Sequence, residues 1–162
     1  VGALNRADGR PVPLVMLSEE AKADAALSQN NPGGSLPIYQ ARVSNAQYEW
    51  WAHEPIAIRA GLPQHIADDL RQCQRPQSMD DTQALVYDFC IQLTLNHQVN
   101  DALWQKAMQL LGEQQVIDLI VLSGTYTMVS MLLNATQVGI PNQGQPPLEV
   151  LSPETIRQRL LA

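Results

Sequence analysis

A glutamate and a histidine four residues apart, Glu49 and His53, are the side chains whose types and spacing best suit chemistry. In a helix this spacing places two side chains on one face, about one turn apart. A carboxyl group and an imidazole in that arrangement can share a proton, and histidine is the side chain whose unperturbed pKa lies nearest neutrality. The pair therefore suggests acid–base chemistry, although a Glu–His pair on a helix is also commonly a structural contact.

Three aromatic residues surround this pair in the sequence, Tyr48, Trp50 and Trp51. Because Trp50 and Trp51 are adjacent, a helix turns one toward the core and the other toward a pocket or a subunit interface. Aromatic side chains beside an acid–base pair would form a pocket wall and exclude water, which strengthens charge interactions inside. For each tryptophan taken singly, core packing is the competing explanation.

Residues 39–60 are predicted to form the helix that carries the pair, since apolar positions recur there every three or four residues. A later segment, residues 113–135, is apolar on nearly all sides, which favours a helix buried on several faces or against another subunit. A strand is the alternative there, but no turn signal divides the segment. Capping residues and apolar spacing predict further helices over roughly residues 18–29, 63–71, 78–97 and 100–112, and a last one near the C-terminus. The predicted N-caps are Ser78, Asn100 and Ser152, and Gly112 is a predicted helix end.

The composition favours a single domain, because the 162 residues lie near the commonest domain size and 45% are hydrophobic. We expect an extended arm over residues 1–17 and one helical domain over residues 18–162. The net charge of -6 disfavours nucleic acid and anionic membranes as partners, since both are negative. No stretch approaches about 18 uninterrupted apolar residues and the N-terminus is too polar for a secretory signal, so we expect a cytoplasmic protein.

The segment YEWWAHEPIAIRAGL, residues 48–62, closely resembles the signature of carboxymuconolactone-decarboxylase-like proteins. Three later blocks, VYDFCIQL, LWQKAMQLLGEQQVIDLIVLSGTYTMVSMLLNA and GIP, resemble later helices of that family in the same order. The resemblance covers residues 35–141. It implies an all-α domain of the AhpD-like fold, assembled into trimers or hexamers, with the active site on the helix that carries the signature.

The cysteines of this sequence do not fit the thiol peroxidases of the same fold. Those enzymes place a CxxC on the signature helix, with a histidine four residues later; here Ala46 and Glu49 take the cysteine places and His53 takes the histidine place. A thiol peroxidase needs a thiolate and a second, resolving sulfur. The two cysteines present, Cys73 and Cys90, have no disulfide-scaffold or zinc-ligand spacing, so we expect structural thiols and no metal.

The resemblance implies instead a lyase that needs no metal or organic cofactor. In the decarboxylation of an unsaturated lactone acid, the conjugated carbonyl accepts the electrons released as carbon dioxide leaves. His53 would then deliver the proton, while Glu49 orients it or handles the proton itself. Tyr126 from the later helix is a further candidate for the pocket, and Arg42 is the nearest basic residue that could meet a substrate carboxylate.

One departure from the family pattern leaves other functions open. The segment SLPIYQARVSNAQYEW is shorter than its family counterpart, and no acidic residue lies between Gly34 and Glu49. Either the helix is truncated here and the pocket is altered, or the sequence lacks residues that a complete protein would have. The first hypothesis is a lyase for a small unsaturated lactone or carboxylic acid, as in the breakdown of aromatic compounds. The alternatives are a non-catalytic oligomer that binds a small molecule, and a different acid–base reaction such as dehydration or isomerisation.

Overall fold

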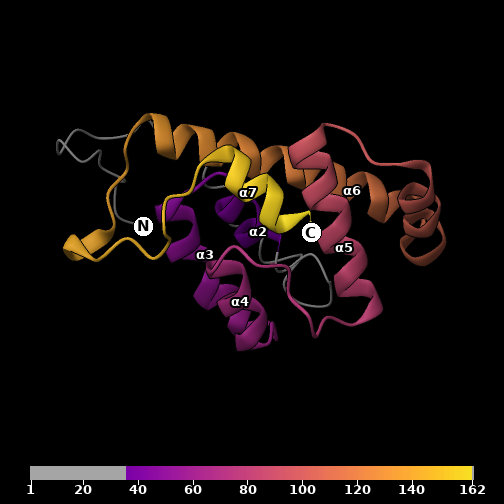
Figure 1. Ribbon diagram of the computed structural model, residues 1–162, viewed down its shortest axis with the longest axis horizontal. Coiled ribbons are helices and arrows are strands. Elements are labelled where there is room, and N and C mark those ends of the chain that lie inside the picture. The colour runs from indigo at the N-terminus through magenta and orange to yellow at the C-terminus, as the bar shows by residue number, and fades with distance from the viewer. Residues whose placement is uncertain (1–35, 162) are drawn as a thin grey trace.

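Helices form the regular secondary structure of residues 36–161, the part of the chain that this computed structural model describes. Within that range there is no strand element, so the predicted all-α class is confirmed. The predicted arm and the predicted helix over 18–29 lie outside the described residues. The elements are α2 (Leu36–Val43), α3 (Gln47–Arg59), α4 (Gln64–Arg71), α5 (Asp81–Asn96), α6 (Asp101–Ala135), the 3-10 helix η2 (Pro141–Gln143) and α7 (Pro153–Leu160) (Figure 1).

The single helix predicted over residues 39–60 is wrong, because α2 and α3 are separate helices with a bend between them. Asn45 in the bend has a φ of 51°, a left-handed conformation that asparagine tolerates better than most residues. Its side chain donates to the carbonyl of Leu151 at 2.9 Å and accepts from the Leu151 amide at 3.2 Å. A distant segment therefore stabilises the bend, and apolar spacing along the chain carries no sign of that contact.

The helix ends follow local capping chemistry closely. Asp80, two residues after the predicted Ser78, caps α5 and forms a capping box with Gln83. Asn100 caps α6 and Ser152 caps α7, as predicted. Pro63 precedes α4 as its N-cap and does not lie inside the helix.

The predicted helix end at Gly112 is confirmed as a break within α6. Gly112 has φ 79° and ψ 167°, outside helical geometry, although helical hydrogen bonding continues on both sides. The chain after it is helical through Ala135, which excludes the strand alternative. Figure 1 shows this long part of α6 running along the upper side of the view, behind α7. By length and composition alone α6 could also cross a membrane, a test that buried core helices pass too.

Helix α2 lies at the centre of the core, and every residue of it except Val43 is buried. It packs against α3, α4, α5 and α6. Gln40 joins α2 to α5 and α6. Its side-chain amide donates to Thr94 of α5 at 2.9 Å and accepts from Thr127 of α6 at 3.2 Å. Tyr87 of α5 donates to the carbonyl of Leu160 at 3.0 Å and so anchors α7 to the core. Apolar packing with a few satisfied polar groups holds the helices that carry the candidate site.

Both cysteines are free and buried in this core. Burial raises the pKa of Cys90 to about 12, and burial likewise raises the pKa of Cys73. Thiols in this state are protonated at neutral pH and react slowly. This environment fits the structural role expected of them.

The free energy of unfolding is expected to fall as the pH rises above about 9, because the folded chain keeps protons that the unfolded chain releases. Burial raises the pKa of Cys90 from 9.0 to about 12 and raises that of Tyr87 above its usual 10.0. One such group costs about 1.4 kcal/mol of stability per pH unit between its unfolded and folded pKa values. Urea unfolding followed by circular dichroism, near neutrality and at roughly pH 10.5, measures the loss. Cys90→Ala should reduce the dependence of the unfolding free energy on pH. Equal urea midpoints of the unmodified protein at both pH values would contradict the prediction.

Candidate functional site

Glu49, in the first turn of α3, has its carboxyl group in the core beside α6. Its side chain is 1% exposed, and the hydroxyl of Ser130, also buried, donates to Oε2 of this carboxyl. Burying a carboxyl group costs free energy unless hydrogen bonds replace those of water. Ser130 supplies one of them, which makes it a member of the site that sequence reasoning missed. The signal available for it was its position one turn after Tyr126.

His53, one turn after Glu49, meets Tyr126 of α6. The two ring centroids lie 5.3 Å apart with an angle of 84° between the planes, an edge-to-face contact. His53 is half-buried and Tyr126 is buried. The structure thus brings together two residues that the sequence analysis named from helices far apart in the chain.

These contacts pair two turns of α3 with two turns of α6. Glu49 meets Ser130 and His53 meets Tyr126, so the two helices run antiparallel at this place. We call the four residues the acid–base cluster. A carboxyl group, an imidazole, a phenol and a hydroxyl can hold or transfer a proton, and the packed helices restrict how far each can move.

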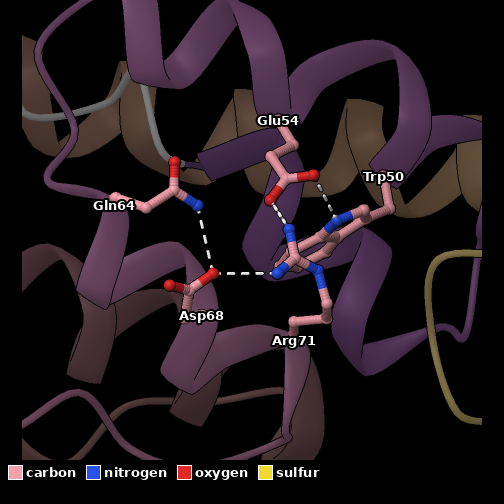
Figure 2. A network of polar contacts seen from close by, with 5 residues as sticks. All are labelled: Trp50, Glu54, Gln64, Asp68 and Arg71. Atoms are coloured by element: carbon pink, nitrogen blue, oxygen red, sulfur yellow. Dashed lines mark hydrogen bonds and ion pairs between the residues drawn. The ribbon is translucent and has the colours of Figure 1, made fainter.

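Trp50 lies on a neighbouring face of α3 and has the contacts of a core residue. It is 0% exposed, and its indole Nε1 donates to Glu54 at 3.1 Å. Arg71 of α4 lies over the indole ring, 5.9 Å from its centroid, and forms an ion pair with the same Glu54. Figure 2 shows Arg71 also donating to Asp68, at 2.8 Å, next to Gln64. This Trp50 network joins α3 to α4.

Tyr48 and Trp51 lie together on a more accessible part of α3. Their ring centroids are 5.5 Å apart, and Trp51 is 41% exposed. Burial raises the pKa of the half-buried Tyr48 hydroxyl. The adjacent tryptophans thus differ: Trp50 lies in the core, as expected for one of the two, and Trp51 is exposed. A role for Tyr48 and Trp51 in a pocket wall stays a prediction.

Arg42 is buried and its guanidinium is held by other parts of the chain. It donates to the backbone carbonyls of Arg71, at 3.3 Å, and Glu149, at 3.0 Å, and to the side chain of Asn45. These bonds tie α2 to the end of α4 and to the segment before α7. Contacts of this kind are structural, and a role toward a substrate carboxylate gains no support from them.

A cavity of about 800 Å³ lies away from the acid–base cluster. It is lined by the end of α5, the start of α6 and residues 157 and 161, and by none of the residues predicted to form the site. Across residues 36–161, no group of three or more His, Cys, Asp or Glu side chains is arranged to hold a metal ion.

The described residues thus define an all-α protein with an acid–base cluster between two antiparallel helices, in which His53 is half-buried and the other three residues are buried. No family model, curated protein or solved structure matches this chain. The resemblance of residues 48–62 to the carboxymuconolactone-decarboxylase-like signature therefore stays a prediction that rests on the sequence.

Proposed function

We propose that this protein is a cofactor-free lyase of the carboxymuconolactone-decarboxylase type, with the AhpD-like fold, acting on a small unsaturated lactone or carboxylic acid. The observation that carries the proposal is the acid–base cluster, in which Glu49 and His53 of one helix face each meet a proton-bearing side chain of α6. The cytoplasmic location, the trimeric or hexameric assembly and the role in breakdown of aromatic compounds that the resemblance implies belong to this proposal.

The reaction requires little of the protein beyond placing a proton. The bond to the carboxylate carbon breaks, and its electron pair moves into the conjugated lactone carbonyl as carbon dioxide leaves. The resulting enolate-like anion takes a proton from protonated His53 at carbon, and water returns the proton to the imidazole. Edge-to-face packing against Tyr126 limits the orientations of the His53 ring, so the donor nitrogen keeps a defined direction.

Glu49 supports this step from inside the helix pair. Its carboxyl lies one helical turn before His53 and accepts a hydrogen bond from Ser130. Because this bond already restricts the side chain, little conformational entropy is lost during the reaction. In this role it orients the imidazole or exchanges a proton with it. Trp50 and Arg42 have no role in this mechanism, because the indole N–H of Trp50 is bonded to Glu54 and the guanidinium of Arg42 is bonded to backbone carbonyls of distant segments.

The test is carbon dioxide release by the purified protein from 4-carboxymuconolactone and a series of related unsaturated acids. We expect Glu49→Gln to lower turnover by about 10²-fold or more, because the amide still accepts the Ser130 hydrogen bond but cannot exchange a proton. Glu54→Gln, which alters the Trp50 network and leaves the cluster intact, serves as the matched control and should keep its turnover. The lyase proposal fails if the unmodified protein releases no carbon dioxide from any of these acids.

The alternative of a non-catalytic binding protein predicts a different result in the same assay. Glu49 and Ser130 could serve packing alone, since buried polar groups are normally bonded in any protein. Such a protein would bind an unsaturated acid, measured by calorimetry, and return it unchanged. Product analysis by nuclear magnetic resonance separates both outcomes from dehydration or isomerisation, which change the acid without release of carbon dioxide.

A further inference from the structure

The long part of α6 has a second apolar face that no described residue covers. The opposite face is buried and includes the acid–base residues Tyr126 and Ser130. On the uncovered face the large apolar side chains are between 37% and 65% exposed. They are Ile117, Val121, Met128, Met131 and Leu132. A continuous exposed stripe of this kind on a protein surface marks an interaction site.

The spacing of this stripe is that of a helix facing another helix. Exposed positions 117, 121, 124, 128, 131 and 135 follow one another at alternating steps of four and three residues. This alternation is the heptad pattern that keeps one seam of a helix against a partner helix. We call these positions the α6 stripe. At a rise of about 1.5 Å per residue the stripe is about 27 Å long.

Gly124 stands at the middle of the α6 stripe and leaves its surface open. A Cβ added there would meet no atom within 4 Å, so packing inside the chain does not require glycine at this position. Glycine within a helix costs about 1 kcal/mol relative to alanine. Its place at the centre of the stripe suits the close approach of a second helix backbone.

The residues on either side of Gly124 are complementary to one another. In an antiparallel pair of α6 helices that cross at Gly124, Met131 of one copy faces Ile117 of the other, and Met128 faces Val121. Long, flexible methionines would then pack against short, branched side chains, which fills space well. A parallel pair would instead place the acidic Glu113 and Asp118 of both copies at the same end, and like charges repel.

We propose that two copies of this chain associate through the α6 stripe, as an antiparallel helix pair around a two-fold axis near Gly124. A self-complementary surface of this kind closes at two copies. It is compatible with a hexamer built from dimers and does not build a trimer by itself. Because the stripe is one helix wide, its area lies at the small end of stable interfaces, and we expect a dimer that dissociates on dilution. The proposal does not depend on the proposed activity.

A lipid bilayer is the competing occupant, since α6 is long and apolar enough to span one. The buried face of the helix argues for packing between proteins. Thr127 and Ser130 donate to Gln40 and Glu49 within the chain, and these polar pairs would lie in lipid if α6 crossed a membrane alone. The α6 stripe itself carries only apolar side chains and a glycine. A second copy of the chain can therefore cover the stripe without breaking those hydrogen bonds.

The first test compares two valines by analytical ultracentrifugation over a range of concentrations. Val121, in the stripe, is 60% exposed, and Val150, outside it, is 73% exposed. Val121→Glu should raise the dissociation constant of the dimer roughly 30-fold or more, while Val150→Glu leaves it unchanged. Both sites are exposed, so both variants should fold, which circular dichroism checks. A wild-type chain that stays monomeric at high concentration, or equal effects of the two variants, would overturn the proposal.

A second test reads the direction of the pair by oxidation of introduced thiols. Gly124→Cys should cross-link with itself, because its two copies lie near the axis. Ile117→Cys should cross-link with Met131→Cys in a mixture and little with itself, whereas a parallel pair gives the reverse. The native cysteines are buried and do not compete. Flotation with phosphatidylcholine vesicles completes the test. If the chain binds the vesicles, Val121→Glu abolishes this binding and no cross-links form, then the α6 stripe contacts a membrane and the dimer proposal is wrong.

Discussion

His53→Gln is expected to lower turnover of the substrate acid by about 10²- to 10⁴-fold, the range that a positioned proton donor contributes. Glutamine has a similar size and still forms hydrogen bonds, but it does not carry a proton to give up at carbon. The ring contact with Tyr126 would be lost as well, so the variant removes both the donor and its orientation. Initial rates of carbon dioxide release at saturating acid measure the change in kcat.

Two further variants make this result specific. His65→Gln changes an exposed histidine of α4, outside the cluster, and should keep turnover within about two-fold, since it does not contact the reacting atoms. Tyr126→Phe keeps an aromatic ring against His53 and removes only the hydroxyl, so it separates ring packing from proton transfer. Urea unfolding of the same samples shows whether the fold is retained. Full turnover in a folded His53→Gln protein would assign the proton donor to another residue.

Trp50→Ala is expected to lower the free energy of unfolding by about 3–5 kcal/mol, the usual cost of truncating a buried aromatic residue. Trp50 is 0% exposed, and the substitution also removes the hydrogen bond to Glu54 and the ring beneath Arg71 (Figure 2). Chemical unfolding followed by far-ultraviolet circular dichroism is the appropriate measurement, because tryptophan fluorescence changes with the substitution itself.

The adjacent residue provides the matched control. Trp51 is 41% exposed and its ring packs against Tyr48 on the same helix, so Trp51→Ala should cost no more than about 1 kcal/mol. Trp50→Phe retains most of the ring volume and loses the indole donor, and it should fall between the two. Equal losses for Trp50→Ala and Trp51→Ala would mean that the Trp50 network does not stabilise the fold.

The network and the acid–base cluster lie on neighbouring faces of α3. Trp50 and Glu54 point toward α4, while Glu49 and His53 meet α6. A helix held on one face by α4 presents its other face to α6 in a fixed rotation. Truncation of the Trp50 ring is therefore expected to affect the site through the position of α3, whereas Glu54→Gln keeps the ring and an acceptor for its indole N–H.

Local sequence pattern was enough to predict α4, α5, α6 and α7 and several of their ends. Asn100 and Ser152 cap α6 and α7, and Gly112 interrupts α6, as the sequence predicts. These features depend on a side chain and a backbone within about three residues of each other, so local pattern is enough. The difference between Trp50 and Trp51 followed from helical geometry, which turns adjacent residues to different faces.

Three features follow only from the folded chain: the bend at Asn45, the buried position of Arg42 and the pairing of Glu49 with Ser130. Each depends on a partner far along the chain: Leu151 for Asn45, Glu149 for Arg42 and Ser130 for Glu49. The rotation and register of α3 against α6 result from the packing of many side chains at once, and no local spacing encodes them. For that reason the sequence could name the glutamate and the histidine, while the hydroxyl that holds the carboxyl came from the folded chain.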